Sequence, residues 1–310
     1  MNWKSGGAKL PSPGWFDRIL LATDGLDSSA VAQKLTAFVA KKFRSKVTVL
    51  HAVSPEYNGM TMTEEDGTGP GYIPIWWNGR IYVPHASEAE NMIANEMRER
   101  GATIVADAVA YFKEEGIEVD QKIENDDPAD AILNDAENHS YYLIAMGGGG
   151  DTEREPRLGS VTKKVALHAK TSVLIARERT QISKILVPVD GSESSQKAFE
   201  NAVALARNTD STMTLIHVLE PSFFNAKPEL GKEIANQILS QAADKGQGVK
   251  IDQKLETGDP AETIIKIAHD ENYDLIVLGS RGHGAVKRWL LGSVSDHVIQ
   301  YTDRSVLLVK

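Results

Sequence analysis

The residues whose types and spacing best suit chemistry form a glycine-rich motif: Gly279-Ser-Arg-Gly282, nine further residues, then Gly292-Ser293. Gly279 ends an apolar run that predicts a strand, and a glycine there lets backbone N–H groups approach a phosphate without an intervening Cβ. Gly292 opens a predicted helix over 294–300, and the N–H groups and positive dipole end of such a helix suit a polyphosphate. Ser293 and Ser295 can add hydroxyl donors. The motif therefore predicts phosphate binding.

A carboxylate stands at the end of an earlier predicted strand. Asp190 follows the run Lys184–Val189, where it can accept hydrogen bonds from a ribose or an adenine. Open α/β sheets bind ligands at the carboxyl ends of their strands. Taken alone, Asp190 is explained as well by turn chemistry or a helix cap as by contact with a ligand. The chain has no Gly-Lys-Ser/Thr, and its glycines follow the fourth strand rather than the first, so the pattern is neither a Walker A loop nor a Rossmann fingerprint.

The elements that must position these residues alternate between short β-branched runs and helical patterns, which predicts an α/β fold with a parallel sheet. In the second half we expect strands near 184–189, 212–219, 249–256, 274–279 and 305–309. In the first half we expect strands near 18–23, 47–53, 117–124, 142–147 and 172–176. Most of these runs are continuously apolar, as expected for strands that helices cover on both faces.

The two halves are repeats of one another. Residues 18–25 match 184–191, and Asp127-Pro-Ala-Asp-Ala-Ile returns as Asp259-Pro-Ala-Glu-Thr-Ile. A repeat of this length indicates a duplicated domain rather than a solenoid unit of roughly 20–50 residues. We place the first domain at 16–178 and the second at 183–310.

The first half carries an insertion of about 34 residues, near 54–87, because its later motifs are displaced relative to those of the second half. The insertion is rich in large apolar groups, which do not stay fully in water: Met60, Met62, Tyr72, Ile73, Trp76, Trp77, Tyr82 and Val83. Two interpretations remain open. The segment packs on the rest of the chain, or it forms a lid or a surface for a partner.

The combined motifs resemble those of a tandem universal stress protein. The pattern of that family is Gly-x2-Gly-x9-Gly-Ser/Thr, which Gly279, Gly282, Gly292 and Ser293 fit without a gap. The resemblance covers nearly the whole chain apart from the leader and the insertion. It implies that each half is a five-stranded parallel sheet in the order 3-2-1-4-5, flanked by helices, of the adenine nucleotide alpha hydrolase-like type.

In the ATP-binding members of this family, the end of strand one, the residue after a strand-two histidine and the glycine motif contact the nucleotide. The resemblance therefore implies that adenine and ribose lie against Pro188, Val189, Asp190 and Val218. It implies that ribose and phosphates lie against Leu278, Gly279, Arg281, Gly282, Gly292, Ser293, Val294 and Ser295. Mg²⁺ would enter with the ATP.

The first half departs from the family pattern. It has Gly147-Gly-Gly-Gly150, only eight residues, and then Gly159-Ser160. The intervening segment holds three acidic residues, which would repel a triphosphate, and the missing residue shifts the second glycine. Thr23 and Asp24 remain at the end of the first strand. This set of residues (Thr23, Asp24, Gly147, Gly150, Gly159 and Ser160) is thus a weaker second candidate for nucleotide binding.

Composition limits the other classes of function. The formal net charge of −9 disfavours attraction to nucleic acid or to an anionic membrane. The chain has no cysteine and no apolar run near the roughly 20 residues of a membrane helix. Residues 1–15 lack the apolar core of a secretory signal. These features lead us to expect a cytoplasmic protein with no disulfides and no dedicated metal site.

We expect a nucleotide-binding regulatory or protective factor of stress responses. No His-Glu-x-x-His or Gly-x-Ser-x-Gly motif supplies a catalytic group, so any ATP hydrolysis should be slow. The alternatives are a nucleotidyl-transferring or phosphate-cleaving enzyme of the same superfamily, and a scaffold that binds a protein or an apolar ligand through the insertion. The last strands of both halves are equivalent sheet edges, whose pairing would make an internal pseudo-dimer. A homodimer of two chains is a further hypothesis.

Overall fold

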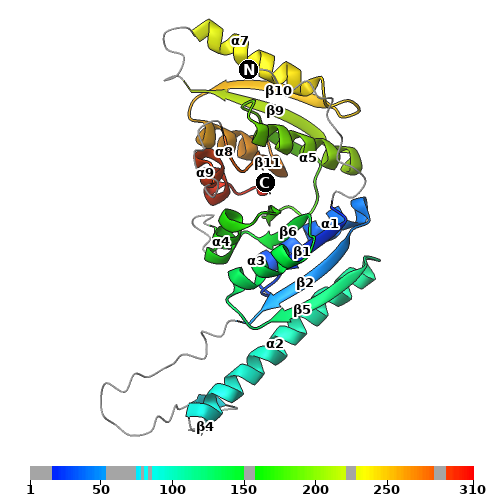
Figure 1. Ribbon diagram of the computed structural model, residues 1–310, viewed down its shortest axis with the longest axis vertical. Coiled ribbons are helices and arrows are strands. Elements are labelled where there is room, and N and C mark those ends of the chain that lie inside the picture. Colours follow the sequence, from blue (N-terminus) through cyan, green and yellow to red (C-terminus); the bar gives the residue numbers. More distant parts are fainter. Residues whose placement is uncertain are drawn as a thin grey trace, which may run out of the picture.

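The computed structural model describes residues 16–53, 75–77, 80–82, 86–149, 158–220, 228–282 and 291–310, with side chains described from 95 onward in the range 86–149. One ten-stranded sheet runs through both halves of the molecule, in the order β10-β9-β8-β11-β12-β7-β6-β1-β2-β5. Helices cover both of its faces (Figure 1). Eight helices are present in these described ranges.

The strands of the large sheet are β1 (Arg18–Ala22), β2 (Lys46–Ala52), β5 (Val119–Glu124), β6 (Leu143–Gly147), β7 (Ser172–Ala176), β8 (Lys184–Pro188), β9 (Thr212–Leu219), β10 (Ile251–Thr257), β11 (Leu275–Gly279) and β12 (Ser305–Val309). The helices are α1 (Asp27–Phe43), α2 (Ala86–Glu114), α3 (Pro128–Asn138), α4 (Ser160–His168), α5 (Glu193–Thr209), α7 (Pro228–Ala243), α8 (Pro260–Asp270) and α9 (Ser293–Tyr301). The expected strands are all confirmed, with ends that differ by at most two residues.

Each half of the large sheet has the predicted strand order 3-2-1-4-5. In the first half the order reads β5-β2-β1-β6-β7, and in the second half it reads β10-β9-β8-β11-β12. Within each half, all neighbouring strands are parallel. The central strands are buried on both faces, since every residue of Ile19–Ala22 and of Leu275–Leu278 is buried. This explains why their sequences are continuously apolar rather than alternating.

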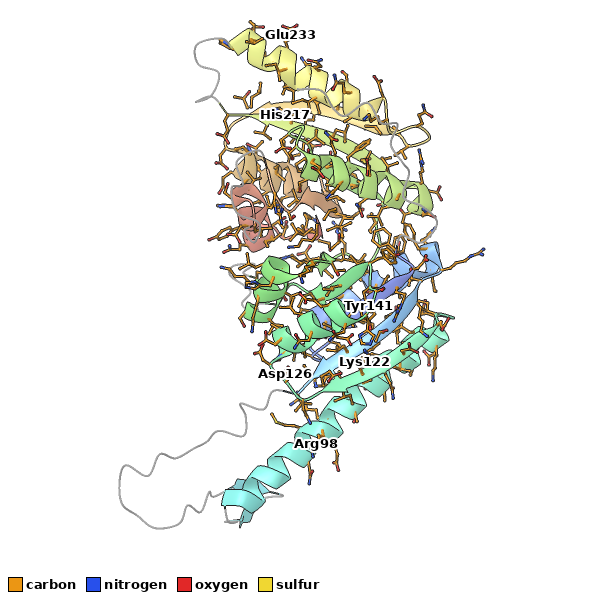
Figure 2. The ribbon with its side chains drawn as sticks, viewed as in Figure 1. Arg98, Lys122, Asp126, Tyr141, His217 and Glu233 are labelled. Atoms are coloured by element: carbon orange, nitrogen blue, oxygen red, sulfur yellow. The ribbon has the colours of Figure 1, made fainter. Side chains whose placement is uncertain are left out.

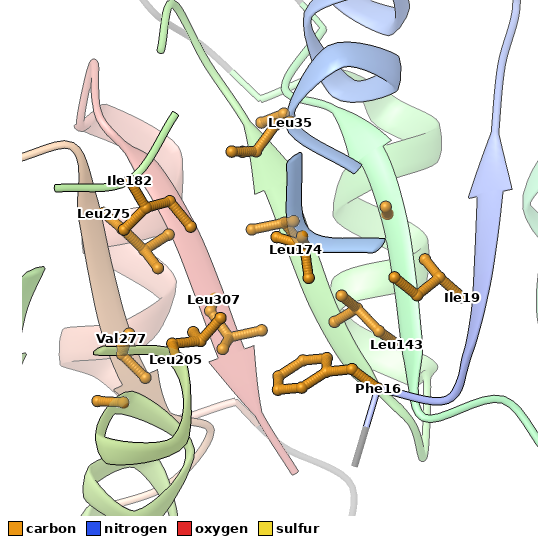
Figure 3. Close-up of a cluster of buried hydrophobic side chains, with 14 of the residues drawn as sticks. Phe16, Ile19, Leu35, Leu143, Leu174, Ile182, Leu205, Leu275, Val277 and Leu307 are labelled. Atoms are coloured by element: carbon orange, nitrogen blue, oxygen red, sulfur yellow. The ribbon is translucent and has the colours of Figure 1, made fainter. Parts of the chain in front are cut away.

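The two halves join through their last strands, as the edge-pairing hypothesis predicts. Strands β7 and β12 are antiparallel, with Leu174 opposite Leu307. The apolar core continues across this seam: Figure 3 shows Leu174 and Leu143 of the first half in the same cluster as Leu307 and Leu275 of the second. One chain thus forms an internal pseudo-dimer, and the edges that remain open are β5 and β10.

Two helices begin with the same cap. The Asp127 carboxylate accepts from the backbone N–H groups of Ala129 and Asp130, and the Asp259 carboxylate accepts from that of Glu262. In both cases proline follows at the first helical position, where its missing N–H costs nothing. The repeated Asp-Pro pair therefore marks a capped helix start in both halves.

We expect Asp259→Ala to lower the free energy of unfolding by about 1 kcal/mol, because the first turn of α8 loses the acceptor for one of its orphan donors. Asp259→Asn should retain most of that free energy, since an amide oxygen caps almost as well. Denaturant titration of the two variants measures this difference. Equal destabilisation by both substitutions would contradict a capping role.

The insertion falls mainly outside the described residues, which include none of 54–74, 78–79 and 83–85. Its described part is a two-stranded antiparallel hairpin, β3 (Ile75–Trp77) with β4 (Arg80–Tyr82). Helix α2 follows and has 29 residues, whereas its counterpart α7 has 16. The first turns of α2 extend beyond the sheet (Figure 1). The two interpretations of this segment, as a packed loop or as a lid or partner surface, stay predictions.

Candidate functional site

The strongest candidate site lies where the strand order of the second half reverses. Strand β8 has β9 on one side and β11 on the other. The chain leaves β8 toward β9 and leaves β11 toward β12, which lie on opposite sides. The carboxyl ends of β8 and β11 therefore form the crevice at the topological switch point. Asp190 follows β8, and the glycine motif begins at the end of β11. The fold thus brings the two sets of predicted site residues together.

Asp190 combines turn chemistry with a position against the glycine motif. Its Oδ1 accepts from the backbone N–H of Ser192 at 2.9 Å, and Ser192 in turn caps α5. A Cβ at Gly282 would lie 3.2 Å from Asp190 Oδ2. The carboxylate therefore borders the phosphate motif, and a larger residue at position 282 would crowd it.

The structure gives a reason for glycine at position 279 that the sequence did not predict. A Cβ at this position would lie 2.6 Å from both the carbonyl carbon and the carbonyl oxygen of Ser194 in the first turn of α5. No such contact exists between real atoms, so only glycine allows the helix to approach the strand this closely. Helix packing beside the site therefore requires glycine at this position, and contact of its backbone with a phosphate stays a prediction.

The N-terminus of α9 points donors toward the motif. Gly292 is the N-cap residue, and no side chain caps this helix. The first four N–H groups of a helix have no intrahelical partner. That of Gly292 donates to the Ser280 oxygen at 2.9 Å, and those of the next residues can serve a ligand. Ser293 is exposed. Ser295 is only 6% exposed and its hydroxyl donates to the Gly279 carbonyl oxygen at 2.7 Å, so its proton holds the helix to β11 rather than a phosphate.

Two cations border the same loop. Arg281 is exposed, and its backbone N–H donates to Ser194 Oγ at 3.2 Å. Burial, together with the nearby Arg281 charge, lowers the pKa of Lys310 to about 8. Sequence reasoning named Arg281 but missed Ser194 and Lys310. The repeat offered a signal for Ser194, because Ser28 occupies the matching position in the first half.

The remaining predicted residues form the floor and the adenine side of the crevice. Leu278 and Val189 are buried, whereas Pro188, Val218 and Val294 are partly buried. The Val189 backbone is fixed on both sides: its N–H donates to the Ile216 oxygen, and its oxygen lies 2.7 Å from Nδ1 of His217 (labelled in Figure 2). His51 makes the same contact with the Thr23 oxygen at 2.8 Å, so the two histidines have equivalent structural contacts in the two halves.

The first half repeats the scaffold of this site. A Cβ at Gly147 would lie 2.6 Å from the Ser28 backbone, and the Thr162 hydroxyl donates to the Gly147 oxygen at 2.9 Å. Gly159 caps α4 without a side-chain hydrogen bond, as Gly292 caps α9. Asp24 Oδ1 accepts from the Leu26 N–H at 3.0 Å. Gly150 lies outside the described residues.

The first half differs at the two points where a nucleotide would be held. The position that matches Arg281 is Gly149, in the left-handed region with φ +66°, so this position supplies no guanidinium. Helix α2 also comes close to the ends of β1 and β2. A Cβ at Gly25 would lie 2.8 Å from Ile104 Cγ1, and a Cβ at Gly101 would lie 2.8 Å from His51 Cδ2.

Neither a metal site nor a membrane span is found within the described ranges. No three His, Asp or Glu side chains gather there in a way that could hold a metal ion. Among the helices of these ranges, none combines the length and apolar character needed to cross a membrane.

Comparison with known proteins points to one family. The family model described as the universal stress protein family matches residues 79–177 and 181–310, which is more than half of the chain. A universal stress protein of Staphylococcus aureus strain USA300 is 33% identical over 137 residues, which cover 41% of this chain and 82% of that protein.

Solved structures resemble the whole molecule. A universal stress protein from Archaeoglobus fulgidus DSM 4304 aligns over 95% of this chain and 98% of its own, with a TM-score of 0.66 and 22% identity. A protein of Pseudomonas aeruginosa PAO1 described as functionally unknown aligns over 95% and 92%, with a TM-score of 0.65 and 16% identity. At these identities the likeness concerns the fold alone.

Proposed function

The chain belongs to the universal stress protein family, and we propose that it binds one ATP per chain at the switch point of its second half. This nucleotide would make the protein a regulatory or protective factor of a cytoplasmic stress response. Membership in the family supports the stress-response role. The nucleotide and its place are our inference from the residues of the site.

The observation that carries the proposal is the convergence of three kinds of group at one crevice. The uncapped start of α9 offers backbone donors for phosphate. The Asp190 carboxylate, beside Gly282, offers an acceptor for ribose hydroxyls or the adenine amine. Arg281 adds a cation at the edge of the loop. Mg²⁺ would accompany the nucleotide through its phosphate oxygens, which are its preferred ligands.

The asymmetry of the proposal rests on the first half as an internal comparison. The scaffold there is retained, but glycine (Gly149) stands at the position of Arg281, and Ile104 of α2 lies against Gly25, which follows β1. A nucleotide held in the first half as we propose for the second would meet this helix. We therefore propose that the first half binds ATP weakly or not at all.

The proposal is tested by denaturing the purified protein and identifying released small molecules by mass spectrometry, followed by titration with Mg-ATP. We expect about one adenine nucleotide per chain. Two per chain would show that the first half is also loaded. If no nucleotide is released and none binds on titration, the proposal fails.

We expect Asp190→Asn to weaken ATP binding about tenfold, because the amide retains the turn with Ser192 but replaces a charged acceptor by a neutral one. The matched substitution Asp24→Asn in the first half should leave the affinity unchanged. Titration of both variants with a fluorescent ATP analogue measures the difference. Equal affinities for the two variants would remove Asp190 from the proposed site.

A further inference from the structure

Each half ends its last strand with a cation that reaches into the other half. Arg177 follows β7, and its Nη2 donates to the backbone oxygen of Ile299 in α9 at 3.0 Å. Lys310 follows β12, and its Nζ donates to the backbone oxygen of Ala166 in α4 at 2.6 Å. The two residues occupy matching positions of the repeat, so the contacts are related by its pseudo-symmetry.

The receiving carbonyls lie in the last turns of the two helices whose first turns belong to the glycine motifs. The last four carbonyls of a helix have no intrahelical partner, and a cation there complements the helix dipole. The Val298 and Val165 oxygens accept from Thr302 and Ala169. Arg177 and Lys310 each satisfy a neighbouring carbonyl. Because Ile299 is the seventh residue of α9 and a helix rises about 1.5 Å per residue, this contact lies only about 9 Å from Ser293 at the N-terminus.

The same two cations also adjoin the glycine loops of their own halves. A Cβ at Gly148 would lie 3.1 Å from Arg177 Cγ and Nε. Lys310 is near enough to Arg281 for the two charges to repel. One side chain therefore links the loop of one half to the glycine-motif helix of the other, in both directions.

Both cations are held where burial works against them. Burial lowers the pKa of Lys310 to about 8. Burial also lowers the pKa of Arg177, while the Asp303 carboxylate opposes that shift. An apolar residue would fill the same space without the cost of desolvating a charge. A charged side chain at a buried position is more readily explained by a functional or positioning role than by packing.

We propose that Arg177 of the first half is a positioning residue for α9, the helix that offers phosphate donors in the second half, and that Lys310 does the same for α4. We call the contacts of Arg177 with Ile299 and of Lys310 with Ala166 the clamp. The expected effect on ATP binding rests on the proposed function, whereas the clamp does not. The clamp means that the second site is complete only when the first half is docked against it. The first half would then act as a support for a site that it does not contain.

The clamp is tested without nucleotide by hydrogen–deuterium exchange of the full chain. We expect Arg177→Met to accelerate exchange at the backbone N–H groups of Gln300, Tyr301 and Thr302, and to leave α4 unchanged. Lys310→Met should accelerate exchange in the last turn of α4 and leave α9 unchanged. If either variant accelerates exchange equally in both helices, or in neither, the inference that each cation holds one helix is wrong.

The effect on the site is tested by titration with a fluorescent ATP analogue. We expect Arg177→Met to weaken binding about three- to tenfold, the range expected from the loss of a cation at a helix C-terminus. Arg177→Lys should restore binding, since lysine serves at the matching position. The control Arg179→Met changes an exposed arginine two residues away and should bind like the wild type. Normal binding by Arg177→Met, or loss in the Arg179→Met control, would overturn the positioning role. Failure of the wild type to bind would instead refute the proposed function, while the exchange experiment still decides the clamp.

Discussion

We expect Gly279→Ala to lower the free energy of unfolding by about 3 kcal/mol, at the upper end of the range for overpacking, and to abolish ATP binding. The added methyl would lie 2.6 Å from the carbonyl carbon and oxygen of Ser194. These are backbone atoms of a helix that is packed on the sheet, so they cannot rotate away as the end of a long side chain would. Either α5 or the end of β11 must move, and both border the proposed site.

The repeat supplies the control for this experiment. Gly147→Ala creates the same clash with the Ser28 backbone in the first half, so it should destabilise the protein by a similar amount. It should leave ATP binding to the folded protein intact, because we propose that the nucleotide lies in the second half. Denaturant titration and ATP titration of the two variants give both quantities. A wild-type free energy of unfolding for Gly279→Ala would show that the helix yields easily, and loss of ATP binding by both variants would remove the asymmetry.

The strands and their order could be predicted because the sequence of each half carries the pattern of the same fold. Apolar runs locate the parallel strands, and the Asp-Pro pairs locate two helix starts. Matching runs in the two halves exclude accidental patterns. The pairing of β7 with β12 followed from the need to protect equivalent edges, and the structure confirms it.

The roles of individual site residues were harder to predict, because they depend on which atoms happen to lie nearby. A glycine before a phosphate motif and a glycine under a helix look the same in sequence, yet Gly279 is held by its contact with Ser194. The Ser295 hydroxyl is directed inward to the Gly279 oxygen. Contacts between halves, such as that of Arg177 with Ile299, join residues far apart in the sequence and leave no periodic pattern.

The approach of α2 to the first half's strand ends could not be predicted from the sequence either. The insertion was found from the displacement of motifs, but its consequence depends on where the following helix lies. Ile104 and Gly101 touch the ends of β1 and β2 because α2 packs closely there. The acidic residues at 151–158 counted against a first site, and of that segment 151–157 lie outside the described residues. The structure adds an independent steric reason.

We expect Gly292→Glu to weaken ATP binding at least about 100-fold while it leaves the free energy of unfolding almost unchanged. A carboxylate about 4 Å from a phosphate charge costs about 4 kcal/mol at an effective dielectric constant near 20, which is enough for this loss. The fold should tolerate the substitution. The nearest atoms to a Cβ at Gly292 lie 3.4 Å away, and a negative charge at the N-terminus of α9 stabilises the helix dipole.

Two further variants show whether charge and place are responsible. Gly292→Gln has nearly the same size without the charge, so it should lose less affinity, and added salt should narrow the difference between Gln and Glu because salt screens exposed charges. Gly159→Glu places the same carboxylate at the start of α4 and should leave ATP binding unchanged. Calorimetric titration with Mg-ATP at two salt concentrations measures all three. Equal losses for Gln and Glu would mean that bulk, rather than repulsion of phosphate, explains the effect. A loss for Gly159→Glu as large as that for Gly292→Glu would place nucleotide in both halves and overturn the assignment of ATP to the second.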